Sequence, residues 1–304
     1  MAIRTDLALE CRELLTEEVS SITSTEETVD NIKITHVKIE NEDGARKIGK
    51  PIGNYITIEI DSLQYESDEL CDKASEIVCK ELKKLIKSDN SAVMVVGLGN
   101  RYITPDSVGP KCVSKIFVTR HLKDVKVENF SFDFRPVSAV APGVLGITGI
   151  ETEETISSIT EKIKPDIIIA VDALAARDLK RLGTTIQISD TGINPGSGVG
   201  NNRKELSEKS LGVPVIAIGI PMVVDASTMT DSTIEIISNY INTHSDTPLF
   251  KMLGSISSED RAKLINEALR GKSENMIVTP NNVDVISEQA AQIIADGINM
   301  ALHD

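Results

Sequence analysis

Four aspartates follow apolar runs that we predict to be strands. They are Asp106 after SAVMVVGLG (91–99), Asp172 after DIIIAV (166–171), Asp190 after TTIQIS (184–189) and Asp225 after VPVIAIGIP (213–221). Ligands of open α/β sheets bind outside the carboxyl ends of the strands. Two neighbouring carboxylates share a proton, so one can accept a proton from water while the other donates to the carbonyl or leaving amine. Paired at one sheet edge, Asp106 and Asp172 would hydrolyse an amide without a metal or a nucleophilic side chain.

A second interpretation of the same aspartates is structural. Aspartate is a favoured helix N-cap, and we predict helices after both Asp106 and Asp172, the latter over 173–182. Asp190 and Asp225 fit caps or loop contacts better than catalysis. The sequence alone leaves both interpretations open, because it does not show whether Asp106 and Asp172 face each other.

Other common catalytic motifs are weak or missing. The chain has no GxSxG elbow, and GLGN at 97–100 continues with Tyr102 at the third glycine position of a dinucleotide fingerprint. GARKIGKP (44–51) resembles a P-loop, but Pro51 replaces the hydroxyl that would bind magnesium, so we predict a basic hairpin loop. None of the four histidines lies near a predicted strand exit, so we expect no histidine-based metal site and no cofactor.

The elements that must position the aspartates alternate between strand and helix. We predict strands at 31–39, 54–60, 91–99, 136–143, 166–171, 184–190 and 213–221, and helices at 7–20, 66–87, 107–121, 151–163, 173–182, 228–242, 257–270 and 281–302. This alternation predicts an α/β fold with a doubly wound, mostly parallel sheet flanked by helices. We expect a single α/β domain over 1–304, with a peripheral β excursion at about 30–62.

Composition limits the classes of function. The 304 residues carry a formal net charge of −14, which argues against a nucleic-acid binder and against an anionic membrane surface. The four cysteines form no CxxC pair and suggest reduced thiols. The chain has no apolar run long enough to span a membrane, so we expect a cytoplasmic protein.

Longer motifs show a resemblance to a known family. The chain resembles the germination proteases of spore-forming bacteria, which degrade small acid-soluble spore proteins. The resemblance runs from RTDLALE to VTPNNVDVI and ALH, and it includes VVGLGN, TPDSVGPK, TRHL, FRPVSA, APGVLGITGIET, DALAAR, TIQISDTGINPGSGVGNNRKE and GVPVIAIGIPMVVDA.

The resemblance implies an aspartic-type endopeptidase whose catalytic pair falls on Asp106 in TPDSVGP and Asp172 in VDALAAR. It also implies a homotetramer in the cytoplasm of the spore core, with spore proteins as substrates. The fold would be similar to that of hydrogenase-maturation endopeptidases, which bind metal with carboxylates and a histidine. This chain offers no equivalent histidine, which favours a metal-free pair.

The family is made as a zymogen that removes its own N-terminal segment. The matching bond here is Asp6–Leu7, which gives a propeptide of residues 1–6. A cut after an acidic residue suggests a cation in the binding pocket. The candidates around the glycine-rich loop and nearby are Arg203, Lys204, Arg177 and Arg135, with Gly196 and Gly198 in the loop itself.

Two other functions fit the same residues. One is a metal-dependent, maturation-type endopeptidase that uses the same carboxylates. The other is a non-catalytic α/β module whose glycine-rich loop binds an anion. Cleavage of a spore-protein peptide, and its resistance to chelation, would separate the three.

Overall fold

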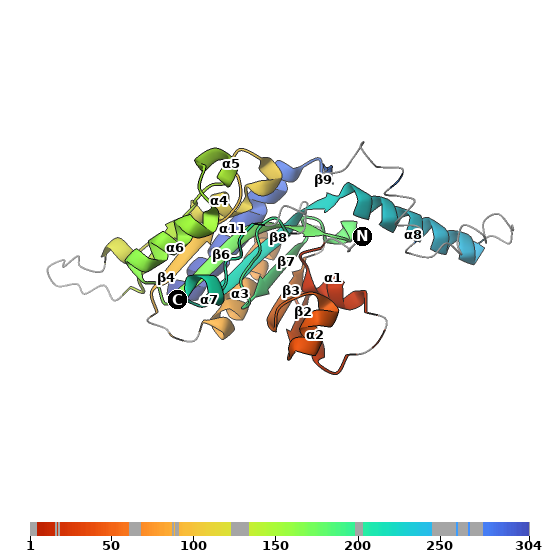
Figure 1. Ribbon diagram of the computed structural model, residues 1–304, viewed down its shortest axis with the longest axis horizontal. Helices are drawn as coiled ribbons and strands as arrows, with labels where there is room; N and C mark the ends of the chain where they lie inside the picture. Colours follow the sequence, from red (N-terminus) through yellow and green to blue (C-terminus); the bar gives the residue numbers. More distant parts are fainter. Residues whose placement is uncertain are drawn as a thin grey trace.

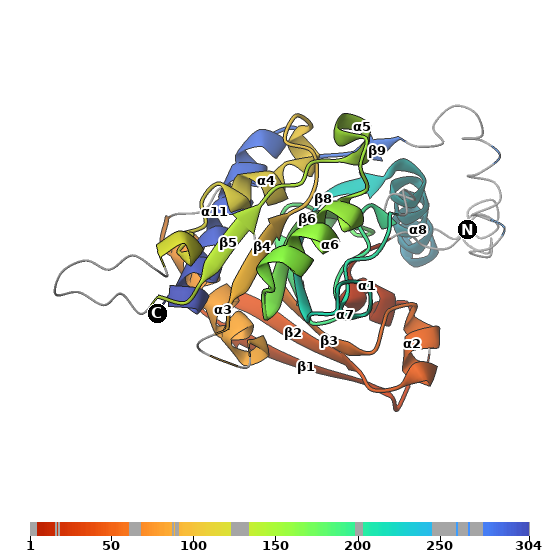
Figure 2. The ribbon, with the colours of Figure 1, turned by 60° about the vertical axis from the view of Figure 1, so that its left-hand side comes forward.

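A computed structural model describes residues 5–15, 17, 19–60, 68–86, 88, 91–122, 134–197, 203–244, 260, 267 and 276–303. Within these residues, nine strands form one sheet in the order β1-β2-β3-β7-β8-β6-β4-β5, with β9 paired to β8. The strands are β1 (Ile22–Val29), β2 (Ile32–Ile39), β3 (Gly53–Glu59), β4 (Val93–Gly97), β5 (Val137–Val140), β6 (Ile167–Ala176), β7 (Thr185–Ser189), β8 (Val215–Asp225) and β9 (Ile277–Val278). Figure 2 shows β1 and β5 at opposite edges.

Helices cover both faces of this sheet (Figure 1). They are α1 (Ala8–Glu13), α2 (Glu42–Ile48), α3 (Asp68–Leu85), α4 (Val108–Val113), α5 (Leu145–Thr148), α6 (Thr152–Ile163), α7 (Glu208–Leu211), α8 (Ala226–His244) and α11 (Val283–His303). The larger core joins one face of the sheet to α3, α4 and α11, and a smaller core joins the other face to α6. The confirmed fold class is therefore α/β, with helices on both faces of an open sheet.

The sheet is parallel where the predicted site lies. β5, β4, β6 and β8 run parallel, whereas β7 and the N-terminal strands are antiparallel to their neighbours. β4 and the first part of β6 read as unbroken apolar runs because both of their faces are buried. Their carboxyl ends meet at one edge, which is the edge expected to carry Asp106 and Asp172.

Several predicted helices proved shorter. The helix predicted over 7–20 is α1, of six residues, and the one over 107–121 is α4, also of six residues. The helices predicted over 66–87, 151–163, 228–242 and 281–302 are present as α3, α6, α8 and α11. The helix predicted over 257–270 lies outside the described residues except at two single positions.

The helix predicted over 173–182 was wrong. β6 continues through Asp172 to Ala176, and only a 3₁₀ turn, η4 (Leu179–Arg181), follows. Every residue of β8 is buried, and it pairs with β6 along this whole stretch, including Asp172 with Gly219. Main-chain pairing with β8 thus outweighs the helix propensity of the alanines and leucine at 173–176.

The N-terminal excursion differs in two ways from the prediction. β1 was not predicted, because it is mostly polar and exposed and gives little hydrophobic signal. The hairpin loop predicted over 44–51 is instead mainly α2. The Asn41 side chain caps its first turn, and Gly49, with φ of 73°, ends it. Antiparallel pairing of β3 with β7 makes this excursion part of the main sheet.

α8 projects away from the body of the molecule (Figure 1). Its Ile236 and Ile237 side chains are 68% and 51% exposed. Among the described residues, no helix is both long and apolar enough to cross a lipid bilayer.

Candidate active site

Asp106 and Asp172 line one cleft of about 380 Å³, of the size that small ligands occupy. Asp106 ends the 3₁₀ turn η2 (Thr104–Asp106) after β4 and does not cap α4 with its side chain. Its carboxylate accepts the Asn100 N–H at 2.8 Å. Gly99, with φ of 102°, lets the two segments meet, because a Cβ there would lie 2.2 Å from the Asp106 carbonyl oxygen.

Asp172 reaches the same cleft from within β6. Its side chain is 4% exposed, and the Ala173 N–H donates to it at 2.9 Å. Because no helix follows β6, the helix-cap interpretation of Asp172 is wrong. Side chains two apart on a strand share a face, so Asp172 lies on the same face of β6 as Leu174.

The cleft raises the pKa of both aspartates. Burial raises the pKa of Asp106 from its usual value of 3.8 to about 6, although the Asn100 hydrogen bond opposes the rise. Burial also raises the pKa of Asp172 well above its usual value, and the charges of Asp106 and Asp6 add to that effect. Both carboxyl groups thus hold a proton more tightly than a free aspartate does, Asp172 through burial and the two neighbouring charges. Such a pair can supply an acid and a base together.

Asp6 brings the N-terminal part of the described chain to this cleft. Asp6 lines the cleft together with both aspartates, and its N–H donates to the Ala175 carbonyl at 2.9 Å. The next residue, Leu7, is fully buried against Leu174, Ala176 and Val224. Asp6, on the amino side of the Asp6–Leu7 bond predicted from the sequence, thus lines the cleft that holds the carboxylate pair.

Two neutral donors bind the carboxylate of Asp6. The Ala175 N–H donates to it at 2.8 Å and the Ser197 hydroxyl at 2.7 Å. Ser197 lies between Gly196 and Gly198 in the glycine-rich loop that was expected to bind substrate. It was not predicted, because serine in such a loop has an ordinary turn-forming role.

The main-chain carbonyl of Asp6 has two further partners. Lys50 Nζ and Gln187 Nε2 each lie 3.0 Å from its oxygen. Gln187 was not predicted, because it is a single polar residue in the buried strand β7. Lys50 belongs to the basic stretch at 44–51, for which a loop and no role in the site was predicted.

The four predicted cations lie in different places. Arg203 lines the cleft and pairs with Glu151 at 3.8 Å, whereas the exposed Lys204 pairs with Glu153 at 3.3 Å. Arg177 follows β6, and its main-chain N–H donates to Glu10. Arg135 precedes β5 and donates to the carbonyl of Ser88, which places it at the amino end of the parallel strands.

Of the remaining predicted residues, some line the cleft and others do not. Gly196 lines the cleft, whereas Gly198 lies outside the described residues. Asp190 is not at this edge, because β7 is antiparallel to β8; it accepts from the main-chain and side-chain nitrogens of Asn54 instead. Asp225 ends β8 and accepts from Ser227, as a cap of α8 would.

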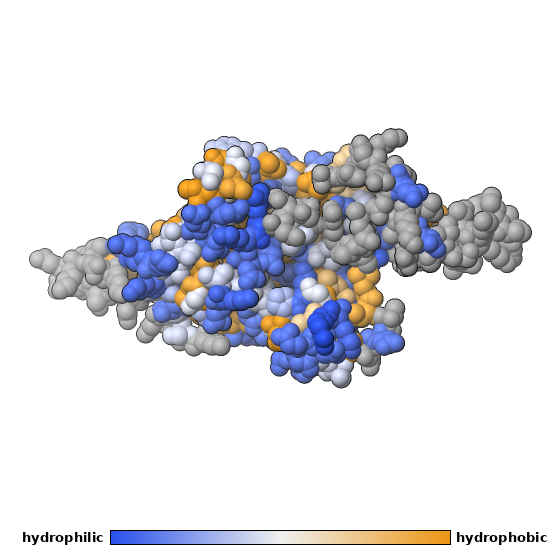
Figure 3. Space-filling view, viewed as in Figure 1, coloured by the Kyte–Doolittle hydropathy of each residue, from blue (hydrophilic) through white to orange (hydrophobic). Residues whose placement is uncertain are grey.

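Hydrophobic side chains border the cleft near α5. Leu145 and Ile103 line it, and Ile103 is 50% exposed. Figure 3 shows hydrophobic residues gathered at α5 on a face that is otherwise mostly hydrophilic, where Ile147 and Ile150 are exposed. An apolar part of a ligand could therefore rest beside the carboxylates.

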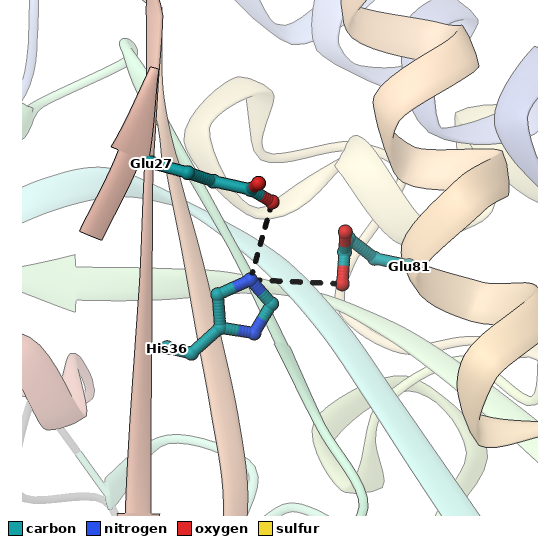
Figure 4. A group of neighbouring side chains, drawn as sticks. All are labelled: Glu27, His36 and Glu81. Atoms are coloured by element: carbon teal, nitrogen blue, oxygen red, sulfur yellow. Dashed lines mark ion pairs between the residues drawn. The ribbon is translucent and has the colours of Figure 1, made fainter. Parts of the chain in front are cut away.

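A second group of ionisable side chains lies away from the cleft, between the N-terminal strands and α3. His36 on β2 points toward Glu27 of β1 and Glu81 of α3, at 3.7 and 3.9 Å (Figure 4). Lys84 also contacts Glu81 at 2.6 Å, and Lys80 approaches Glu27 at 4.0 Å. Because lysines already balance both carboxylates, we interpret this group as an ion-pair network that ties the N-terminal strands to α3.

Comparisons with known proteins agree with the resemblance. The model of a family described as germination protease matches residues 4–247 and 238–304. The chain is 47% identical to the germination protease of Caldanaerobacter subterraneus subsp. tengcongensis, across 99% of this chain and 94% of that protein. It is 44% identical to the germination protease of Clostridium perfringens, across 99% and 95%, and 41% identical to that of Geobacillus sp., across 100% and 94%.

Proposed function

Since this chain belongs to the germination protease family and is a protease, we propose that it degrades small acid-soluble spore proteins during germination. It cuts the peptide bond after an acidic residue, using water activated by Asp106 and Asp172. The observation that carries the mechanism is that both carboxylates and the acidic Asp6 line one cleft.

The two carboxylates take different roles. Asp106, with a pKa of about 6, is ionised near neutral pH and accepts a proton from the attacking water. Asp172, whose pKa burial raises well above the usual range, keeps its proton and gives it to the leaving amine. Burial raises the pKa of both aspartates, so the same cleft supplies the general base and the general acid.

The Asp6–Leu7 bond is the self-cleavage site of a zymogen, and residues 1–6 are its propeptide. This proposal is supported by the position of Asp6 in the cleft and by the burial of Leu7 beside it. Until the bond is cut, Asp6 occupies the cleft and excludes the acidic side chain of a substrate protein.

Substrates follow the same pattern as residues 6 and 7. An acidic side chain takes the place of Asp6 and accepts from the Ala175 N–H and Ser197, while an apolar side chain takes the place of Leu7. Arg203 remains a second candidate for reading the acidic group, because it lines the same cleft.

The enzyme acts as a homotetramer in the cytoplasm of the spore core. The exposed isoleucines of the projecting α8, Ile236 and Ile237, support an assembly, because apolar side chains on a projecting helix suit a protein contact. Sedimentation analysis tests the tetramer.

A peptide with a Glu–Ile bond tests the main proposal. The protein should cut it after Glu, and Asp172→Asn should abolish cleavage while the fold persists. Substantial cleavage by Asp172→Asn would refute the aspartate pair. An intact peptide would favour the anion-binding module. Activity that disappears on chelation and returns with metal would favour the metal-dependent endopeptidase.

A further inference from the structure

We propose that Lys50 and Gln187 are catalytic residues that bind the carbonyl oxygen of the bond to be cut and stabilise the negative charge that forms on it. This inference rests on the proposed function, because it takes Asp6–Leu7 as the bond that is hydrolysed.

Both donors hold the oxygen at hydrogen-bond distance. Lys50 Nζ and Gln187 Nε2 each lie 3.0 Å from the Asp6 carbonyl oxygen. Lys50 directly follows Gly49, whose left-handed backbone ends α2. Gln187 comes from the middle of β7, so two segments 137 positions apart converge on one oxygen (187 − 50).

The orientation of Gln187 is fixed by a second hydrogen bond. Its Oε1 accepts the Ala8 N–H at 2.7 Å, which leaves Nε2 to donate to the Asp6 carbonyl. The side chain is 8% exposed, so water competes little for the donor. A donor held in place before the reaction stabilises a developing charge without reorganising, and this is among the largest effects in catalysis.

The donors and the carboxylates approach the peptide from different cavities. Asp6 and Leu174 border both a cavity that contains Lys50 and Gln187 and the cleft that contains Asp106 and Asp172. The negative charge that forms on the carbonyl oxygen can thus be stabilised by Lys50 and Gln187 on one side, while the attacking water is held by the carboxylates on the other.

The proposed hydrolysis has two steps. Water oxygen bonds to the Asp6 carbonyl carbon and gives a proton to Asp106, and the carbonyl electron pair moves to the oxygen bound by Lys50 and Gln187. When that pair returns, the bond to the Leu7 nitrogen breaks, and the nitrogen takes the proton of Asp172. The proton gained by Asp106 replaces the one lost by Asp172, so the products are a carboxylic acid and an amine.

Self-cleavage of the full chain tests the proposal. The first-order rate of appearance of the Leu7 amino terminus is measured for Lys50→Met and for Gln187→Glu. Glutamate keeps the acceptor for the Ala8 N–H, so this variant removes the donor without freeing the segment. Each variant should cleave about 10²-fold more slowly or worse, the effect of losing one such donor. Lys50→Arg should retain more activity than Lys50→Met.

Matched controls use neighbours outside the site. Lys47→Met removes an exposed cation of α2 that pairs with Asp43, and Thr185→Val alters the same face of β7 at a buried hydroxyl without a partner. Both should cleave within threefold of wild type. If Gln187→Glu fails to fold, as judged by its unfolding temperature, Gln187→Met replaces it.

The possible outcomes distinguish a failure of the proposed function from a failure of the role proposed for Lys50 and Gln187. A wild-type chain that cuts neither its own bond nor the Glu–Ile peptide refutes the proposed function and this inference with it. A wild-type chain that cuts both, with Lys50→Met and Gln187→Glu cutting equally fast, refutes this inference alone.

Discussion

Replacing Asp106 by Asn should stabilise the protein at neutral pH, because the buried charge is costly. The folded-state pKa of Asp106 is about 6, against a usual value of 3.8. The folded state therefore holds the proton more tightly, and the stability that this proton gives is present below pH 3.8 and lost as the pH rises through about 6. A difference of roughly two pKa units corresponds to about 3 kcal/mol at pH 8.

Asparagine is neutral at every pH and can still accept the Asn100 N–H. The variant should gain about 3 kcal/mol in unfolding free energy at pH 8. The gain should shrink to about 0.5 kcal/mol at pH 4, where the folded state is almost fully protonated and the unfolded state is roughly 40% protonated. Urea unfolding of wild type and variant at the two pH values measures the difference.

The control is Asp43→Asn on the surface of α2. Lys47 lowers the pKa of Asp43, so this substitution should give no gain at pH 8. A gain for Asp106→Asn that is equal at pH 4 and pH 8, or a loss at pH 8, would show that burial does not raise the pKa of Asp106 and would remove the physical basis for its role as a base.

The cleft and the ion-pair network around Glu81 can also be tested by pH and by substitution. Peptide cleavage (kcat/KM) should rise with pH through about 6 as Asp106 loses its proton, and fall at higher pH as Asp172 loses its own; a flat profile would contradict the pair. Ser197→Ala should lower kcat/KM about tenfold for a Glu–Ile peptide and much less for a Gln–Ile peptide, because a hydrogen bond to a charged group contributes about 1.5–3 kcal/mol. Equal losses for the two peptides would show that Ser197 does not recognise the acidic side chain. Glu81→Gln should lower the unfolding free energy by about 1–3 kcal/mol, because Lys84 and His36 lose a buried partner. If zinc instead raises the unfolding temperature of wild type, and His36→Ala abolishes that rise, the group is a metal site.

Local sequence was sufficient to predict the strands that position the site. Apolar runs predicted β4 and β6, and the rule for parallel strands predicted that the segments after them meet at one edge. That rule predicted Asp106 at this edge, because η2 is the next element after β4 along the chain. It failed for Asp190, because strand direction in a mixed sheet depends on which neighbour a strand pairs with, and β7 pairs antiparallel.

The sequence by itself determined the α/β class. It also predicted the pair Asp106 and Asp172 and the bond between Asp6 and Leu7, since each depends on residue types or motifs within a short segment. Only the tertiary structure decided that β6 continues past Asp172, because the strand that pairs with it, β8, lies more than 40 positions away in the chain. It also decided that Lys50 and Gln187 meet at the Asp6 carbonyl. Contacts between distant segments depend on how the whole sheet pairs, and residue spacing carries no record of them.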